Sequence, residues 1–528
     1  MVVCKKSLAA VPLRAVFMAI SSVHIAGILL TVGLLLLIGI LSGRRVKDAK
    51  SFVSGGRSGS WMVCGIVMGT LVGGQSTIGT AQLAFCYGLS AWWFTIGAAL
   101  GCVALALFYV VPLRRSGCVT LSEIIAKEYG HKAETIGSLL CLGGIFISIV
   151  SQVLASSAMI TSLFGLSSVL AALASAVLIA CFVFFGGIRS AGIGGLLKVA
   201  LLYVSSIAAA VIVLRLVGGL ENVWHDIGSL YSHNPILADT ASLPDDTAVR
   251  QRFGSLVARG PLKDVGSGLS LLLGVVSTQT YAQGVWAARS HREARRGVLL
   301  SAVLVPIIGA ACTLVGLYMR GHYVTIGEQE TLAAAGQAVP TGMGVLKNTA
   351  EVFPRFILDC CPDGLGGIVL GTLLVTVLGG GSGLALGAAT ILVRDVFSNM
   401  VPSVRGGDTR RLYRFSIVGL VALAVVVALA SHRTLINDLG FLSLGLRATA
   451  LLLPLSCALF LPGRFGVGTM VTSMVSGTLV MFGAFLLGLP SDPIFWGIGV
   501  ELAVCLVASF PHSRGRNQSD YKSSRMLR

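Results

Sequence analysis

The sequence predicts an all-α polytopic membrane protein with about thirteen transmembrane helices. Of its 528 residues, 55% are hydrophobic and only 12% are charged, which is the composition of a chain whose solvent is the bilayer. Apolar runs of about 20 residues, enough to cross about 30 Å of hydrocarbon at 1.5 Å per residue, recur from one end of the chain to the other. These runs leave no soluble domain of useful size.

Each expected helix is one such run, and short loops separate the runs. Their approximate cores are Ser22 to Leu41, Trp61 to Ala84, Ser90 to Pro112, Glu134 to Phe164, Ser168 to Phe185, Ala191 to Val217, Gly266 to Ala288, Val298 to Met319, Gly364 to Val393, Tyr413 to Ser431, Thr434 to Leu461, Gly466 to Leu487 and Pro493 to Phe510.

The spans fall into units. In chain order we predict an N-terminal segment outside the fold (1–21), an additional first helix (22–42), five helices (61–217), an external loop (218–265), five more helices (266–461), two peripheral helices (466–510) and a basic cytoplasmic tail (511–528). The first segment is read either as signal-like or as preceding a true start at Met18.

Basic residues alternate between loops, and this predicts the orientation, because short cytoplasmic loops retain Lys and Arg. The basic loops contain Arg44, Arg45, Lys47, Lys50, Arg57, Arg114, Arg115, Arg289, Arg292, Arg295, Arg296, Arg405, Arg410, Arg411, Arg514 and Arg516. The turns near Gly88, Gly165 and Leu489 have none, so the N-terminus is expected outside and the C-terminus in the cytoplasm. The net charge of +17 then reflects topology and attraction to anionic lipid rather than nucleic-acid binding.

Twelve cysteines are present, and most fall inside predicted spans as small packing residues. Cys360 and Cys361 are adjacent, but no second pair stands at metal-ligand spacing. We therefore expect no zinc, iron or redox cofactor and no enzymatic activity.

Two of the predicted helices are interrupted in their middle. Residues 72–79 contain a glycine pair followed by Gln75, Ser76 and Thr77, and residues 276–283 read Val-Ser-Thr-Gln-Thr-Tyr-Ala-Gln. Non-helical backbone at membrane depth persists only where protein or a cavity satisfies it. Each break opens a group of five helices, and matching breaks in two halves indicate an inverted-repeat transporter with its site at the midplane.

The order of several motifs resembles the sodium:solute symporter family, whose fold is of the LeuT type with one helix ahead of a five-plus-five repeat. The resemblance covers most of the chain. It rests on Phe52-Val53-Ser54-Gly55-Gly56-Arg57, Gly74-Gln75-Ser76-Thr77-Ile78-Gly79, Tyr87-Gly88-Leu89, Pro112-Leu113-Arg114, Thr120-Leu121-Ser122-Glu123, Gln283 with Ala287-Ala288-Arg289-Ser290, and Ala389-Thr390 with Arg394-Asp395.

The resemblance implies a sodium ion between the first broken helix and the ninth span. Its carbonyl ligands would be those of Gly69 and Val72, and the backbone ligand of the ninth span would be Thr376. The family's paired hydroxyl residues fall on Gly379 and Gly380, so this chain lacks both hydroxyls.

A shifted register would still let Thr376 and Ser382 supply oxygens to sodium. Alternatively, the glycines at this point serve close helix packing.

The sixth span departs from the family in a second way. Where the family commonly has Asp and then Gln, this chain has Gly195 and Lys198. An ammonium has the charge of sodium and can exchange a proton, so Lys198 could replace the coupling ion, as the resemblance to sodium-independent members of the wider superfamily suggests. The alternative is that Lys198 reaches the interface on its flexible stem.

The solute is expected to contact Gln75, Ser76 and Thr77, because the helix break places them near the midplane; hydrogen bonding between helices is the alternative. Thr278, Gln279 and Gln283 could face the same cavity, but their spacing places them on different faces.

Two further polar side chains lie inside predicted spans. Gln152 could reach the cavity or, as we favour, a neighbouring helix. Arg447 could meet an anionic solute or a structural carboxylate, but it stands too far from Asp438 to pair within one helix.

The sequence therefore predicts a secondary transporter in the cytoplasmic (inner) membrane that imports a small organic solute by alternating access, as a monomer or weak homo-oligomer. Sodium is the expected coupling ion, and a proton-coupled or sodium-independent mechanism through Lys198 is the alternative. A sensor acting with a separate signalling partner is an alternative of another class, and a passive channel is disfavoured by the opposed broken helices.

Overall fold

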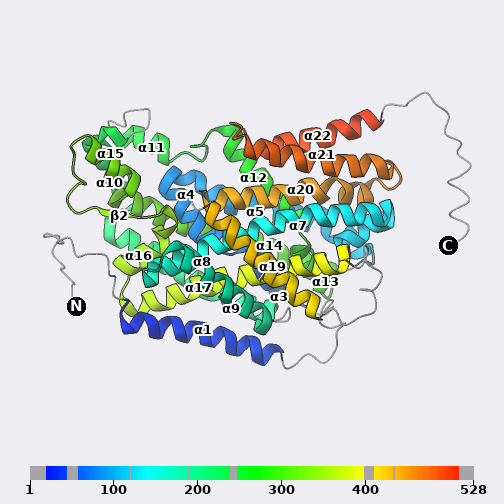
Figure 1. Ribbon diagram of the computed structural model, residues 1–528, viewed down its shortest axis with the longest axis horizontal. Helices are drawn as coiled ribbons and strands as arrows, with labels where there is room; N and C mark the ends of the chain where they lie inside the picture. Colours follow the sequence, from blue (N-terminus) through cyan, green and yellow to red (C-terminus); the bar gives the residue numbers. More distant parts are fainter. Residues whose placement is uncertain are drawn as a thin grey trace, which may run out of the picture.

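The computed structural model describes residues 20–43, 58–118, 120–186, 190–237, 246–397, 410–431 and 434–509. The predicted N-terminal segment before residue 20, the segment 44–57 with its basic residues, Arg405 and the tail that we predict to be cytoplasmic lie outside this part of the chain. Long helices run side by side along the longest axis of the molecule (Figure 1).

The first half begins with α1 (Ser22–Gly43). A broken helix follows, made of α3 (Ser60–Leu71), the π-helical turn η1 (Gln75–Gly79) and α4 (Thr80–Tyr87). The remaining elements are η2 (Gly88–Trp92), α5 (Trp93–Ala104), η3 (Leu105–Tyr109), α6 (Val110–Arg115), α7 (Leu121–Phe164), α8 (Ser168–Gly186) and α9 (Ser190–Val217).

The second half begins with another broken helix, α12 (Pro261–Val276) and α13 (Gln279–Ala287). It continues with α14 (His291–His322), α17 (Asp363–Thr390), η6 (Ile391–Phe397), α19 (Arg410–Ala430) and α20 (Ile436–Phe460). The last helices, α21 (Val467–Leu486) and α22 (Pro493–Ser509), pack against each other at one edge of the bundle (Figure 1).

Short elements gather at one end of the bundle, which we call the loop end (Figure 1). They are α10 (Leu220–His233), η4 (Pro235–Leu237), α11 (Asp246–Phe253), β1 (Tyr323–Thr325), α15 (Ile326–Ala334), β2 (Gly344–Leu346), η5 (Thr349–Glu351) and α16 (Val352–Cys360). β1 and β2 pair in parallel. The opposite end, which contains the start of α14 and the end of α6, is called the arginine end.

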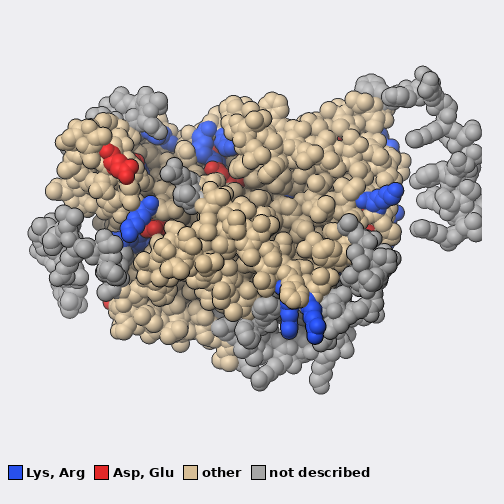
Figure 2. Space-filling view, viewed as in Figure 1, with Lys and Arg blue, Asp and Glu red and all other residues tan. Residues whose placement is uncertain are grey.

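Within the described residues, eight helices are long and apolar enough to cross a membrane, and four shorter apolar helices accompany them. The face drawn in Figure 2 agrees with this, because uncharged surface covers most of it. The number thirteen stays a prediction. Most helix bounds lie within a few residues of the expected cores.

In three places the helices differ from those expected from the sequence. The run expected from Glu134 begins at Leu121, and the chain changes direction at Gly130, whose φ of 80° only glycine adopts readily. The expected external loop 218–265 contains the helices α10 and α11 and the first residues of α12. The segment between α14 and α17 also folds, into β1, α15, β2, η5 and α16.

Long helices surround the two broken helices, which therefore lie in the centre of the bundle. α7 packs along α20, α3 packs against α9 and α14, and α12 packs between α5 and α20. α17 contacts α1, α7, α8 and α9. The largest apolar core joins α3, α4, α5, α12, α14 and α17.

Candidate functional site

The first break separates α3 from η1. Val72 ends α3 in an extended conformation (φ −92°, ψ 101°), so the helical ladder stops there. Gln152 of α7 accepts a hydrogen bond from the backbone N–H of Gly74 at 3.0 Å. A side chain on Gly73 would stand 2.7 Å from the Gln152 amide nitrogen, so a larger residue at this position would displace the Gln152 amide. Gln152 therefore serves the break itself, in keeping with the interpretation as a helix-to-helix contact.

The three polar residues after the break are buried, and each hydrogen bonds to protein. Ser76 Oγ donates to the Leu71 carbonyl and Thr77 Oγ1 to the Gly73 carbonyl, both at 3.0 Å. Gln75 Nε2 donates to Ser151 Oγ of α7 at 2.5 Å. The hydroxyls thus satisfy the interrupted carbonyls, whereas the amide of Gln75 points toward α7. Their role toward a solute stays a prediction.

The second break lies between α12 and α13. Ser277 ends α12 and Thr278 begins α13 as its N-cap. Ser277 Oγ donates to the Leu273 carbonyl at 2.8 Å and Thr278 Oγ1 to the Gly274 carbonyl at 2.7 Å. The break predicted at 276–283 is therefore present, and side-chain hydroxyls satisfy its carbonyl end.

The polar side chains of the second break diverge, as their spacing predicts. Thr278 accepts a long hydrogen bond, 3.4 Å, from Arg447 Nη1. Gln279 Oε1 instead accepts from the backbone N–H of Leu121 at 2.8 Å and so caps the start of α7. Gln283 is half-buried in the middle of α13. Of these three residues, the structure places Thr278 at the centre.

Lys198 of α9 is buried, with 6% of its surface exposed. Its Nζ donates to the backbone carbonyl of Gly69 at 2.8 Å, one of the two carbonyls expected to bind sodium. Gly195, one turn earlier, lies so close to α3 that a Cβ there would stand 2.4 Å from the Gly65 carbonyl oxygen. The missing side chain at Gly195 therefore lets α9 approach α3 and brings the ammonium to the carbonyl.

The ninth span, α17, contacts both α9 and α3. Thr376 is fully buried, and its Oγ1 has no hydrogen-bond partner among the described residues. Ser382 Oγ donates to the Gly379 carbonyl of its own helix at 3.0 Å. A Cβ on Gly379 would meet nothing within 4 Å, and one on Gly380 would meet Gln152 at 3.5 Å, so both positions have room for a small side chain.

A second buried cation lies deeper in the bundle. Arg447 of α20 is 1% exposed, and its Nη2 donates to Ser148 Oγ of α7 at 2.6 Å and to Ser443 Oγ at 2.7 Å. Its Nε has no partner among the described residues. In the sequence, Arg447 stands out as an arginine in the middle of an apolar run. No sequence pattern, however, connects it with the second break.

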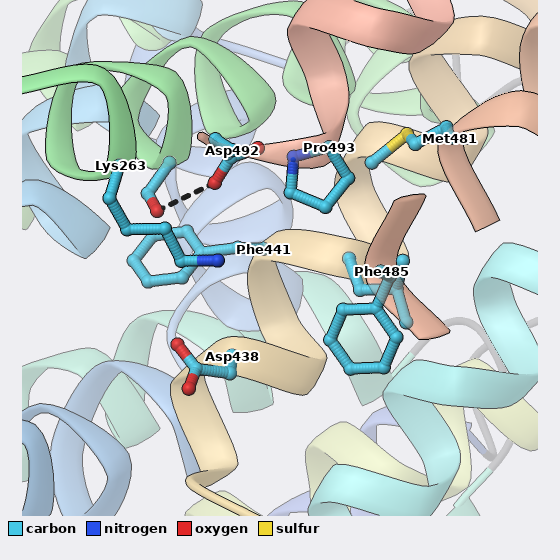
Figure 3. A pocket seen from close by; sticks show the side chains of 9 residues that line it. Lys263, Asp438, Phe441, Met481, Phe485, Asp492 and Pro493 are labelled. Atoms are coloured by element: carbon cyan, nitrogen blue, oxygen red, sulfur yellow. Dashed lines mark hydrogen bonds between the residues drawn. The ribbon is translucent and has the colours of Figure 1, made fainter. Parts of the chain in front are cut away.

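A cleft opens near the loop end between α12, α20 and the turn from α21 to α22 (Figure 3). Its lining includes Lys263, Asp438 and Asp492, and its cavity volume of about 10 Å³ holds about one water molecule. Arg259 bridges two carboxylates here, at 2.6 Å from Asp264 Oδ1 and 2.9 Å from Asp438 Oδ1. The ion pair therefore joins the start of α12 to the start of α20.

The guanidinium of Arg259 also lies over the Phe441 ring, 5.4 Å from its centroid. Phe441 packs against Phe94, and a Cβ on Gly440 would stand 2.7 Å from Phe94 and 3.2 Å from the amide carbon of Gln75. The ion pair, the two rings and the first break thus follow one another inward from the loop end.

At the arginine end, backbone hydrogen bonds tie the two broken helices together. The backbone N–H of Ser58 donates to the Ala287 carbonyl at 3.1 Å and that of Arg289 to the Ser58 carbonyl at 3.0 Å. Arg114 donates to the carbonyl of Ala288 at 2.6 Å. The chain before α3 and the end of α13 therefore form one unit.

Glu293, at the start of α14, adds a side-chain contact to this unit. It accepts from the Ser60 N–H at 2.7 Å and from the Ser60 hydroxyl, and Arg289 donates to it at 3.2 Å. These bonds lower the pKa of Glu293 to about 2, those from Ser60 above all. Glu293 thus stays ionised and caps α3 from another helix.

The described residues contain no group of three or more His, Cys, Asp or Glu side chains able to hold a metal ion. Backbone carbonyls and hydroxyls are the oxygens available at the first break, and these suit a hard monovalent cation rather than a transition metal.

The sequence profile of the sodium:solute symporter family matches residues 52–465. The chain is 22% identical over 425 residues to the uncharacterized symporter YwcA of Bacillus subtilis (strain 168). The matched region covers 79% of this chain and 77% of that protein. It is 23% identical over 462 residues to the high affinity choline transporter 1 of Homo sapiens, which covers 84% and 73%, respectively.

Two solved structures show the same fold. A Na⁺-coupled sialic acid symporter in a substrate-bound outward-open state matches with a TM-score of 0.67 at 16% identity, covering 93% of this chain and 97% of that chain. Mhp1, a nucleobase-cation-symport-1 family transporter in a closed conformation, matches with a TM-score of 0.51 at 11% identity, covering 91% and 100%. The expected LeuT-type fold is thereby confirmed.

Proposed function

Because the chain belongs to the sodium:solute symporter family and is a multi-pass membrane transporter rather than an enzyme, we propose that it imports a small organic solute by alternating access around the two helix breaks. The observation that carries this proposal is the meeting of α3–η1–α4 and α12–α13 in the centre of the bundle. Both breaks are lined with buried polar side chains, and such breaks are typical of transporter sites.

Residues 61–217 and 266–461 would be the two moving repeats, and the arginine end would face the cytoplasm with the N-terminus outside. The basic residues at the end of α6 and the start of α14 support this orientation. The Arg259 ion pair would keep the loop end closed in this mechanism. Opening it would lead toward Gln75, and the polar groups at the breaks would receive the solute.

Family membership fits sodium as the coupling ion, yet the contact between Lys198 and Gly69 supports the alternative for this chain. A buried ammonium needs oxygen acceptors, and a carbonyl that would otherwise bind a cation provides one. With glycine at both expected hydroxyl positions, the ammonium takes the place of the ion. Coupling would then follow the protonation of Lys198 rather than sodium binding.

Transport in proteoliposomes tests both ideas. Amino acids, sugars and carboxylates would be offered under a sodium gradient alone and under a proton gradient alone, with Lys198→Ala and Lys198→Arg beside wild type. The lysine mechanism predicts uptake that follows the proton gradient, is indifferent to sodium and is abolished by Lys198→Ala. Lys198→Arg keeps the charge but not the proton exchange, so it should also be inactive while folding normally.

Sodium-driven uptake that survives Lys198→Ala would overturn the lysine mechanism and leave the transport proposal intact. Uptake of no offered solute under either gradient would contradict transport and favour a sensor that works through a separate signalling partner.

A further inference from the structure

We propose that Arg447 recognises the carboxylate of an anionic solute at the second helix break. This rests on the proposed transport function and narrows its substrate to solutes with a net negative charge.

The charge of Arg447 is uncompensated. Among the described residues no carboxylate lies within 4 Å of its guanidinium, and all of its hydrogen-bond partners are neutral hydroxyls. Burying an ion without a counter-ion is costly, and intramembrane charges are ordinarily paired or aimed at a site. An anionic ligand would supply the missing charge.

The position of Arg447 is that of a binding site rather than of a structural ion. Its three hydroxyl partners come from different parts of the bundle: Ser148 from α7, Ser443 from α20, and Thr278 from the second break. Ser151, one turn from Ser148, accepts from Gln75 of the first break. The guanidinium therefore lies between the two breaks.

The neighbouring backbone favours an anion as well. Thr278 is the N-cap of α13, so the positive end of that helix lies beside the guanidinium. The carbonyl end of α12 is already satisfied by the hydroxyls of Ser277 and Thr278. Two positive groups thus meet, and a helix N-terminus is a ready site for a carboxylate.

The guanidinium has donors to offer. Nε is unpartnered, and the bond from Nη1 to Thr278 is long at 3.4 Å. Nη2 already donates to two serine hydroxyls, so a carboxylate would accept from the N–H of Nε or from Nη1. Glycine at position 144 makes room for the Arg447 side chain itself, since a Cβ there would stand 2.9 Å from Cγ of Arg447.

The experiment compares carboxylates with their uncharged amides. Purified protein is heated in detergent with acetate, lactate, pyruvate or benzoate, and with acetamide, lactamide, pyruvamide or benzamide, and the thermal shift is measured. At least one carboxylate should stabilise wild type, and its amide should not. Arg447→Lys should weaken the response by about 10-fold, because a compact ammonium replaces the planar guanidinium with its several fixed donors. Arg447→Gln should abolish it.

Arg464→Gln is the matched control, because Arg464 is an exposed arginine in the turn after the same helix; its response should equal that of wild type. The melting temperature without solute gives an independent readout. Arg447→Gln should leave it unchanged or raise it, since an uncompensated charge is removed, whereas a purely structural role predicts a fall. If Arg447→Gln does not fold, the carboxylate and amide responses are compared in Arg447→Lys, which keeps the charge, and in Ser148→Ala, which removes one hydroxyl partner of Arg447.

Absence of a shift with every carboxylate, or a carboxylate response retained by Arg447→Gln, would overturn the proposal. Gradient-driven uptake of only neutral or cationic solutes would overturn it while leaving transport standing. Uptake of nothing at all would instead contradict the transport function.

Discussion

Arg259 joins the start of α12 to the start of α20 near the loop end, and replacing it should loosen that contact. The Asp264 carboxylate that it contacts is fully buried, and Asp438 is 29% exposed. In Arg259→Gln the Asp264 charge would be left buried and unpaired, which typically costs about 3–5 kcal/mol. Asp438 is partly exposed, so water can solvate it once Arg259 is gone, and we take the lower end of this range, about 3 kcal/mol. This energy corresponds to about a 100-fold rise in the population of the open state.

Hydrogen exchange measured by mass spectrometry is the assay. Peptides covering the start of α12 and the start of α20 should exchange up to about 100-fold faster in Arg259→Gln than in wild type, wherever the exchange rate follows the equilibrium population of the open state. Arg250→Gln is the control, since Arg250 pairs with Glu221 at the surface, with side chains 47% and 75% exposed. Such a pair contributes about 0–1 kcal/mol.

Lys263 lines the same cleft (Figure 3) and could replace part of the lost charge, so the double variant with Lys263→Gln should exchange fastest. Exchange in Arg259→Gln and in this double variant that stays within about threefold of wild type would refute the reasoning, because an unpaired buried carboxylate cannot be neutral in energy.

Three other outcomes are expected. Lys198→Ala combined with Gly379→Ser and Gly380→Ser should give sodium-stimulated uptake, because space exists at both glycines; no sodium effect in the triple variant would speak against the mapped ion position. Gly195→Ala should lower the melting temperature, since its Cβ would stand 2.4 Å from a carbonyl of α3 and overpacking costs about 1–3 kcal/mol; an unchanged melting temperature would contradict this packing. Burial raises the pKa of Glu351 to about 7, so the folded state holds a proton that the unfolded state releases near 4.5, and stability should fall as pH rises from about 5 to 7. Glu351→Gln should remove that fall in melting curves, and an equal fall in both proteins would exclude Glu351 as its source.

Much of the fold follows from the sequence, because each long helix is a continuous apolar run whose length the bilayer sets. The breaks were also predictable, since the glycine pair at residues 73 and 74 and the polar run after Val276 have no other explanation at membrane depth. The helices of the loop end were missed because they are short and amphipathic and depend on the bundle for their stability.

The site was predictable only in part. That Gln152 would bind the backbone of the first break rather than face a cavity depends on which side of α7 meets α3, and a near-uniformly apolar helix does not reveal its faces. The partners of Arg447 come from residues far apart in the chain, so no local pattern could join them. Lys198 was noticed because a charge inside a span is rare, but its contact with Gly69 required the close approach that Gly195 permits.

The backbone pairing of Ser58 with the end of α13 bears on how the protein can move. Two backbone hydrogen bonds join the chain before α3 to the end of α13. We therefore expect α3 and α13 to move together, with Val72 and Ser277 as the hinges. Neither α3 nor α13 can move away from the centre of the bundle unless the other helix moves with it or these two hydrogen bonds break. In the proposed transport cycle, the path toward the arginine end would therefore open only by a joint movement of both halves, and a substitution that stiffens either hinge would slow that movement.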